Sequence, residues 1–117
     1  MLRIRTLLAV AAVLGLALTT VQFAAARSHV TTTVTVKAKE FRFILSTKTG
    51  AKTVVFKVTN VGKLPHDFKI SGKKTSLIAP GKSATLRVNF PVAGKYPYLC
   101  TVPGHAAAGM KGTFTVK

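Results

Sequence analysis

A two-residue alternation beyond residue 30 constrains the fold of this chain most strongly. In TTTVTVK (31–37) threonine alternates with valine. Side chains two apart on a strand share a face, so this pattern is typical of strands that bury one side. Other short segments are rich in β-branched and aromatic residues, as strands are. The predicted strands are 31–37, 41–46, 53–59, 67–70, 84–90, 96–100 and 113–116.

Turn residues separate these strands, and no segment has a sustained helical period. The turns are predicted at 48–50, 60–62, 71–72, 79–81 and 92–94. Short strands at this spacing predict an all-β Greek-key β-sandwich with antiparallel pairing. A chain of 117 residues without an internal repeat allows one such domain. We place the domain at 31–117, with 27–30 as a short lead-in.

The aromatic side chains of the predicted strands are expected to form the core. Tyr96 and Tyr98 share the face of Cys100 because of the two-residue period, and Leu99 points to the opposite face. The predicted core aromatic residues are Phe41, Phe43, Phe56, Phe90, Phe114, Tyr96 and Tyr98.

The first 26 residues have the features of a secretory signal peptide. Arg3 and Arg5 precede an apolar run from 7 to 18, and the stretch FAAA (23–26) ends in small residues of the Ala-x-Ala type. Cleavage is therefore predicted after Ala26, which places the domain in the periplasm or outside the cell. A retained membrane helix is the alternative. The apolar run is short for a span, so we expect no integral membrane anchor after cleavage.

The chain is strongly basic, with 18 Lys and Arg against two acidic residues and a net charge of +16. Loss of Arg3 and Arg5 with the signal peptide would leave 16 basic residues and a charge of +14. Such a charge attracts an acidic protein or an anionic envelope in a salt-dependent way. The basic residues are dispersed as on a solvated sheet face, and no nucleic-acid-binding motif accompanies them. We therefore expect no nucleic-acid partner.

A lone cysteine needs protection in an exported protein because it can form no internal disulfide. Metal ligation would protect it. The stretch YLCTVPGHAAAGMKG (98–112) follows Cys100 with His105 and Met110 at five-residue steps. One strand–loop–strand hairpin can thus present S, N and S donors at one end of a sandwich. His66, in NVGKLPHDF, lies between a turn and a strand and could supply a fourth donor there.

One thiolate, two imidazoles and one thioether favour copper in a trigonal His₂Cys site with a weak axial Met. A structural zinc site would normally use four Cys or His ligands. Taken singly, each residue has a plainer explanation: a core methionine, a small buried cysteine or a hydrogen-bonded turn histidine. Taken together, in a predicted exported sandwich, the four residues predict one bound copper ion.

The chain resembles the cupredoxins, the blue type 1 copper proteins such as plastocyanin, azurin, rusticyanin and auracyanin. The resemblance covers nearly all of 31–117, and its motifs are GKYPYLCTVPGHAAAGMKG (94–112) and PHDF (65–68). The spacing of the ligands looks more like rusticyanin and auracyanin than plastocyanin. The resemblance implies three strong ligands and one axial ligand: His66, Cys100 and His105, with Met110 axial.

Two neighbours of these ligands are expected to tune the site. The backbone N–H of Val102 could donate to the Cys100 sulfur, which should raise the reduction potential. Asp67 could bond Thr101 and pin two ligand segments together, and its charge would favour Cu(II) and lower the potential. The alternative for Asp67 is a plain residue at the start of a strand.

We expect one electron port, at the edge of His105. The surrounding residues are small, apolar or rigid and would let a partner approach closely: Leu64, Pro65, Val102, Pro103 and Ala106 to Ala108, rimmed by Lys63 and Lys111. Plastocyanin has a second route through a tyrosine next to its cysteine, with acidic patches nearby. Here that neighbour is Leu99. The expected partner is an acidic redox protein, a cytochrome, oxidase or reductase, and the expected oligomeric state is a monomer.

Cleavage after Ala26 would also create a second candidate copper site. The new terminus Arg27-Ser28-His29 would offer an amine, two backbone nitrogens and an imidazole, a square-planar set that suits Cu(II). The alternative is a solvated tail.

The leading functional interpretation is a diffusible carrier that shuttles single electrons by cycling between Cu(I) and Cu(II). The alternative is copper storage, delivery or resistance, although chaperones usually offer open sites rich in Met or His. This chain has two methionines and three histidines. An enzyme is not expected, because copper nitrite reductases and multicopper oxidases need additional His-rich sites. The sequence leaves the electron donor, the acceptor and the potential open.

Overall fold

A computed structural model of the chain describes residues 11–25 and 28–117. Residues 11–25 form neither helix nor strand, and their side chains are exposed. The basic start of the predicted signal peptide and its cleavage point lie outside the described residues, so the signal peptide stays a prediction. None of the described residues belongs to a helix that is long and apolar enough to cross a membrane.

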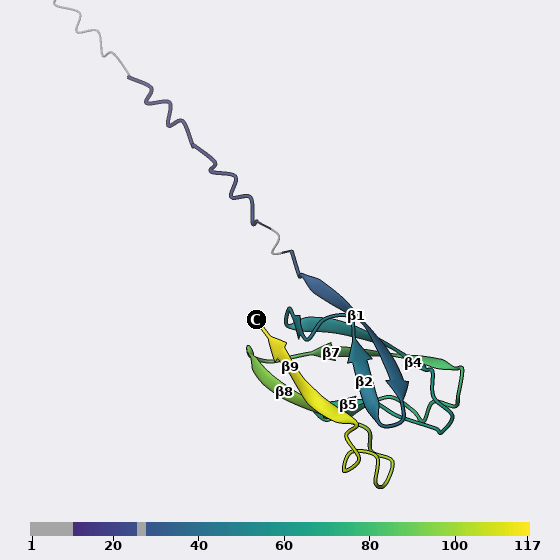
Figure 1. The fold of residues 1–117 in the computed structure, drawn as a ribbon. Coiled ribbons are helices and arrows are strands. Elements are labelled where there is room, and N and C mark those ends of the chain that lie inside the picture. The colour runs from purple at the N-terminus through teal and green to yellow at the C-terminus, as the bar shows by residue number, and fades with distance from the viewer. Residues whose placement is uncertain (1–10, 26–27) are drawn as a thin grey trace, which may run out of the picture.

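The described residues form nine strands (Figure 1). The strands are β1 (Thr31–Lys39), β2 (Arg42–Leu45), β3 (Thr49–Gly50), β4 (Thr53–Asn60), β5 (Lys69–Ile70), β6 (Lys73–Lys74), β7 (Ser83–Asn89), β8 (Gly94–Leu99) and β9 (Lys111–Val116). They make two sheets, in the orders β2-β1-β4-β7 and β3-β9-β8-β5-β6. The predicted all-β sandwich is confirmed, and each predicted strand overlaps an observed one.

The pairing within the sheets is mixed, so the expectation of purely antiparallel pairing is wrong. β1 runs parallel to β4, from Thr31 opposite Thr53 to Ala38 opposite Asn60, and β3 runs parallel to β9. The chain crosses to the other sheet at β3 before it returns as β4, which lets β1 and β4 run in the same direction. The two-residue alternation predicts which face of a strand is buried, but it contains no information on which neighbour the strand meets.

The core lies between the sheets and is filled mainly by alternate residues of the longer strands. Val34, Val36 and Ala38 of β1 are fully buried, whereas Thr35 and Lys37 between them are exposed. Aromatic rings fill the centre, with Phe56 tilted against Phe68 at a centroid distance of 5.0 Å. The remaining buried hydrophobic residues are Val54, Val58, Ile70, Ile78, Val88, Phe90, Tyr98, Cys100, Met110, Phe114 and Val116.

The prediction of a core position is wrong for one aromatic residue. Phe41 is 40% exposed, and its ring lies edge-on to that of His105 with the centroids 5.1 Å apart. It belongs to the turn before β2 begins at Arg42, so the alternation of a strand does not apply to it. The other predicted aromatic residues are buried or, for Phe43 and Tyr96, packed against the core while half-buried.

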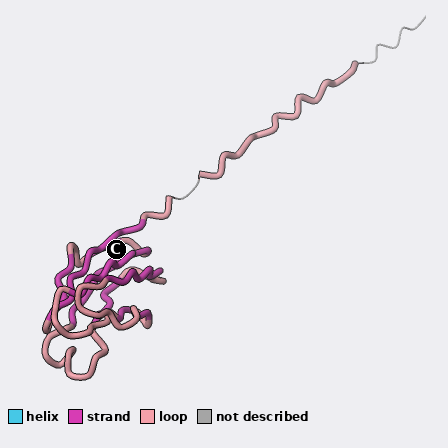
Figure 2. The backbone as a smooth tube through the Cα atoms, turned by 90° about the vertical axis from the view of Figure 1, so that its right-hand side faces the viewer, coloured by secondary structure: helices cyan, strands magenta, loops and turns pink. Residues whose placement is uncertain are grey.

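The two ends of the sandwich differ. The start of β1 and the C-terminus lie at one end, whereas the long loop between β8 and β9 extends at the other (Figures 1 and 2). Loops dominate that second end, and the predicted ligands lie there.

Candidate metal centre

His66 lies in the loop between β4 and β5 and is fixed by hydrogen bonds to the backbone of Ile78, between β6 and β7. Its N–H donates to the C=O of Ile78 at 3.1 Å, and its C=O accepts from the N–H of Ile78 at 2.7 Å. The buried side chain of Asn60 closes the same loop. Its amide donates to the C=O groups of Leu64 (2.7 Å) and Ile78 (2.8 Å), and its oxygen accepts from the N–H of Gly62 at 2.9 Å. The position of the His66 ring is therefore set by a network of hydrogen bonds to the main chain.

Cys100, His105 and Met110 come from the loop between β8 and β9. The N–H of Cys100 donates to the C=O of Met110, and the N–H of Met110 donates to the C=O of His105, both at 3.0 Å. The loop turns tightly at Gly104, where φ is +84°, a conformation that favours glycine. The five-residue steps thus bring the three side chains to one end of the sandwich, as predicted.

The rings of His66 and His105 and the thiol of Cys100 converge on one point. Nδ1 of His66 lies 3.1 Å from Nδ1 of His105, and Sγ of Cys100 lies 3.6 Å from Nδ1 of His105. All three donor atoms lie within 4.8 Å of one another, and all three residues are buried. Nitrogen and sulfur ligands at about 2.0–2.3 Å from one ion have separations of this order. The cluster therefore fits a single metal ion.

Met110 is fully buried in the same loop. Its backbone is tied to both Cys100 and His105, which keeps its side chain at the ligand end. A thiol and two imidazoles with a buried thioether in the same loop form the donor set that suits copper. The structure brings His66, Cys100 and His105 together, whereas the role of Met110 as an axial ligand stays a prediction.

A family model described as copper binding proteins, plastocyanin/azurin family, matches residues 17–117. The chain belongs to this family. The predicted cupredoxin fold and the predicted copper cofactor are thereby confirmed, since the family match and the geometry of the three donors agree.

Two curated proteins are similar to this chain over short stretches. Auracyanin-B of Chloroflexus aurantiacus is 48% identical over 42 residues, which are 36% of this chain and 18% of that protein. The copper-resistant cuproprotein CopI of Pseudomonas aeruginosa is 46% identical over 41 residues, 35% of this chain and 23% of that protein. The matched stretch therefore spans about a fifth of the length of these relatives.

Solved cupredoxin structures are similar over most of the chain. Rusticyanin from Thiobacillus ferrooxidans is 27% identical with a TM-score of 0.62, and the match covers 74% of this chain and 77% of rusticyanin. Reduced auracyanin from Roseiflexus castenholzii shares the fold at 24% identity and a TM-score of 0.63, with 74% of this chain and 97% of that chain covered. The predicted likeness to rusticyanin and auracyanin is confirmed.

Asp67 makes the contact that the sequence predicts. Its Oδ1 accepts from the N–H of Thr101 at 2.6 Å, and its Oδ2 accepts from the Thr101 hydroxyl. Asp67 is 4% exposed. It joins the segment of His66 to the segment of Cys100, so it is more than a residue at the start of a strand. Its effect on the potential stays a prediction.

Glu40 contacts the metal centre, and the sequence analysis misses it. Oε1 of Glu40 lies 3.1 Å from Nε2 of His66, the ring nitrogen that faces away from the cluster. The signal that could have found it is rarity, because Glu40 and Asp67 are the only acidic residues of the chain. Both lie at the metal centre.

The pKa values of Glu40 and of the Cys100 thiol are shifted from their ordinary values in opposite directions. Hydrogen bonds from the backbone lower the pKa of Glu40 to about 2, and the one from Leu64 contributes most. Glu40 is therefore a carboxylate at neutral pH. Burial raises the pKa of the Cys100 thiol, and the backbone N–H groups of Asp67 and Val102 oppose this rise. The contribution of Val102 is in the direction predicted for a donor to the sulfur. Copper binding at neutral pH must therefore displace the thiol proton.

The surface around His105 is largely apolar. His105 itself is 8% exposed, whereas Leu64, in the loop that carries His66, is 43% exposed. Pro65 and Pro103 are also exposed. The exposed ring of Phe41 adds to this surface through its contact with His105.

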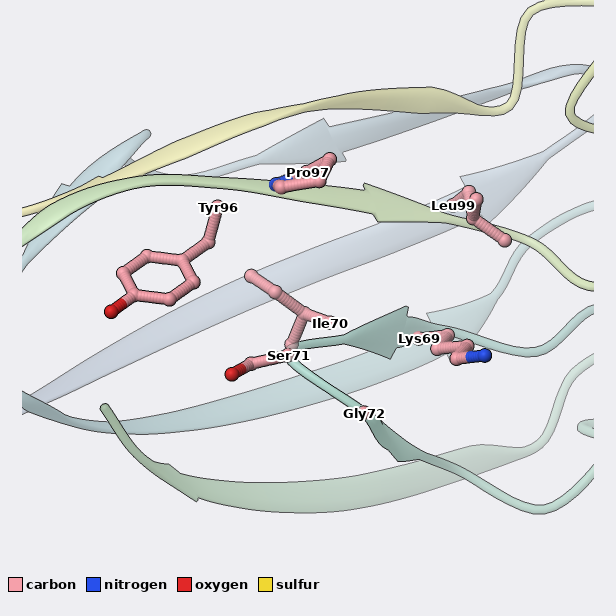
Figure 3. Close-up of a pocket in the computed structure, with 7 residues that line it drawn as sticks. All are labelled: Lys69, Ile70, Ser71, Gly72, Tyr96, Pro97 and Leu99. Atoms are coloured by element: carbon pink, nitrogen blue, oxygen red, sulfur yellow. The ribbon is translucent and has the colours of Figure 1, made fainter. Parts of the chain in front are cut away.

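A pocket of about 290 Å³ lies elsewhere, between β8 and the turn that joins β5 to β6 (Figure 3). Its lining residues are Lys69, Ile70, Ser71, Gly72, Tyr96, Pro97 and Leu99. Leu99 faces this pocket, whereas its neighbour Cys100 faces the metal centre, as the strand period predicts. The pocket contains none of the predicted ligands.

The second candidate copper site is not tested by the structure. His29 is exposed, and Arg27 lies outside the described residues. This site stays a prediction, as do the acidic partner, the monomeric state and the absence of a nucleic-acid partner.

Proposed function

We propose that the protein is an exported type 1 copper protein that shuttles single electrons between redox partners. The observation that carries this proposal is the convergence of two imidazole Nδ1 atoms and one thiol within 4.8 Å in a buried site. His66, Cys100 and His105 would be the strong ligands, with Met110 as the weak axial one. When bound, copper supplies a one-electron cycle between Cu(I) and Cu(II).

The contribution of the protein is a site that changes little between the two oxidation states. Main-chain hydrogen bonds fix the His66 loop, and Asp67 joins it to Thr101 beside Cys100. The loop of His105 and Met110 is closed by its own backbone. Ligands held by packing and hydrogen bonds from several segments need little rearrangement, and that favours fast electron transfer.

Electrons would enter and leave through the edge of His105, and the partner would be an acidic redox protein. The apolar surface at Phe41 and Leu64 supports close approach. Lys63 and Lys111 are exposed near it and would attract acidic groups of the partner. Such a carrier can act as a monomer.

Export to the periplasm or the cell exterior is part of the same proposal. The basic start, the apolar run and the small residues before Arg27 support it. An oxidising compartment would also explain why the single thiol of the chain is buried at a metal site.

Copper storage, delivery or resistance is the second candidate function. The similarity to a relative named as a copper-resistant cuproprotein favours it. The closed site argues against it, since His66 and Met110 are 0% exposed and Cys100 is 1% exposed. A site from which copper is delivered should open more readily than this one.

The visible spectrum of the protein with one equivalent of Cu(II) tests the proposal. A type 1 site gives an intense blue thiolate-to-copper band that bleaches with ascorbate and returns on reoxidation, and Cys100→Ser abolishes it. A pale spectrum would contradict the proposal. Transfer of the copper to a competing chelator within seconds would instead favour delivery or storage.

A further inference from the structure

The turn between β1 and β2 brings a carboxylate to the far side of one copper ligand. His66 directs Nδ1 to the cluster, where it lies 3.1 Å from Nδ1 of His105. Its other nitrogen, Nε2, lies 3.1 Å from Oε1 of Glu40. We propose that Glu40 is a positioning residue that fixes the protonation of His66 and biases the centre toward Cu(II).

The two ring nitrogens of His66 need different protonation states, because one faces a carboxylate and the other faces the cluster. A neutral imidazole carries one N–H and one lone pair. A carboxylate can only accept, so the proton of His66 resides on Nε2 and points to Glu40. Nδ1 then keeps its lone pair for the ion. A carboxylate behind a metal-ligating histidine also makes the ligand nitrogen more basic and holds the ring in orientation.

Glu40 is itself held in place by groups other than His66. The same Oε1 accepts from the N–H of Lys63 at 2.8 Å and from the N–H of Leu64 at 2.6 Å. Glycine at position 62 permits this approach, because a Cβ there would lie 2.6 Å from both carboxylate oxygens. The carboxylate therefore joins the β1–β2 turn to the loop that carries His66, and it is fixed before any ion binds.

The charge of Glu40 is not neutralised by a cation. Among the described residues, the contact with His66 is the only one between an acidic and a basic group within ion-pair distance. A fixed negative charge behind a ligand stabilises the more positive state of the ion, here Cu(II). The side chain of Glu40 is 25% exposed, so solvent screens part of this effect.

The part of this inference that concerns Cu(II) rests on the proposed copper function, whereas the part that concerns the proton of His66 does not. The two parts therefore need separate experiments. Two variants separate the hydrogen bond from the charge. Glu40→Gln keeps an acceptor oxygen and removes the charge, and Glu40→Ala removes both.

The first experiment uses the metal-free protein and ¹⁵N–¹H NMR of the histidine rings. We expect His66 to carry its proton on Nε2 in the wild type and in Glu40→Gln. In Glu40→Ala we expect a severalfold rise in the form protonated on Nδ1. Gly62→Ala should have the same effect by displacing the carboxylate. An unchanged proton position in Glu40→Ala and Gly62→Ala would overturn the positioning role.

The second experiment uses the copper-loaded protein and its reduction potential. We expect Glu40→Gln to favour Cu(I) over Cu(II) by roughly tenfold relative to the wild type, or about 59 mV for one electron. Glu40→Ala should also weaken Cu(II) binding by roughly 10–100-fold. Thr85→Lys, on the exposed face of β7, raises the net charge by the same one unit outside the segments that carry the ligands and serves as the control.

The outcomes of the two experiments are distinct. A potential of Glu40→Gln equal to that of Thr85→Lys would overturn the bias toward Cu(II). Should the wild type bind copper without a blue band, the proposed function fails, and the NMR result still decides whether Glu40 positions His66. Should Glu40→Ala fail to fold, Gly62→Ala and Glu40→Gln keep both parts testable.

Discussion

The ligand end and the outer faces of the sheets differ in the burial and hydrogen bonding of their polar side chains. At the ligand end the polar side chains of Asn60, His66, Asp67 and His105 are buried and hydrogen-bonded, and both acidic residues of the chain lie there. On the outer faces the strands carry exposed lysines and arginines such as Lys37, Lys57 and Arg87. No lysine or arginine forms an ion pair within the described residues.

The buried and the exposed polar groups therefore have different roles. Buried hydrogen bonds are directional and little screened, so they fix the geometry of ligands. Exposed charges act over longer distances, are screened by salt and influence how fast partners meet. Substitutions of the buried polar groups should therefore change stability and potential, whereas those of exposed charges should change association rates, most of all near the port.

Asn60→Ala should give the largest loss of stability. The side chain makes three hydrogen bonds, to Gly62, Leu64 and Ile78, and Asn60 is 0% exposed. Removing such a buried network should lower the free energy of unfolding by about 2–4 kcal/mol. The matched control is Asn89→Ala, since Asn89 is exposed and accepts one hydrogen bond from Thr53. Urea unfolding of the metal-free proteins measures both, and equal losses would contradict the contrast between the two regions.

Acid should destabilise the metal-free protein through Glu40. The pKa of Glu40 is about 2 in the folded protein and 4.5 ordinarily. A lowered folded pKa stabilises the fold above the ordinary value, and this contribution is lost as the pH falls from about 4.5 to about 2. Urea midpoints between pH 6 and pH 2 should fall more steeply for the wild type than for Glu40→Gln. Parallel slopes would show that the carboxylate contributes nothing to folding.

Much of the fold follows from the sequence, and the exceptions have physical causes. Strands with alternating burial, such as β1 and β4, are visible because one face is apolar. β3 and β6 have two residues each, too few for a period, and β3 falls on the predicted turn at 48–50. The parallel pairing of β1 with β4 depends on a crossover, which local patterns do not contain.

Asp67→Asn should raise the reduction potential while the fold is kept. The amide oxygen can still accept from Thr101, so the two ligand segments should stay joined. Loss of a buried negative charge beside the Cys100 segment disfavours Cu(II). Voltammetry of the copper-loaded variant and of Thr85→Lys measures the difference. An unchanged potential would remove the electrostatic role and leave Asp67 with the structural one only.

The sequence predicts the ligands of the metal centre better than it predicts the residues around them. Cys100, His105 and Met110 lie in one short stretch, and His66 is one of only three histidines. Glu40 is 26 positions from His66, and only the fold makes them neighbours. The sequence predicts Phe41 in the core because its ring is apolar and its segment resembles a strand, yet the turn places it beside His105.

Charge reversal near the port should slow association with an acidic redox partner. Lys63→Glu should lower the second-order rate severalfold at low salt, and Lys57→Glu on the outer face of β4 should lower it less. Both rates should approach the wild-type rate at high salt, where screening is strong. Stopped-flow kinetics with an acidic cytochrome measures them. A wild-type rate that does not fall with rising salt would contradict electrostatic docking.

Leu99→Ala should have the smallest effect on electron transfer, although Leu99 is bonded directly to Cys100. Its side chain lines the pocket beside β5 (Figure 3), whereas the next residue, Cys100, faces the metal centre on the other side of the strand. With a single port at His105, the rate with the same cytochrome should stay within about twofold of the wild type, because the docking surface is unchanged. Leu64→Ala is the matched control at the port, and it should slow the reaction more. A larger effect at Leu99 than at Leu64 would mean that partners also dock at the pocket, and the ligand end would no longer be the only route to the copper.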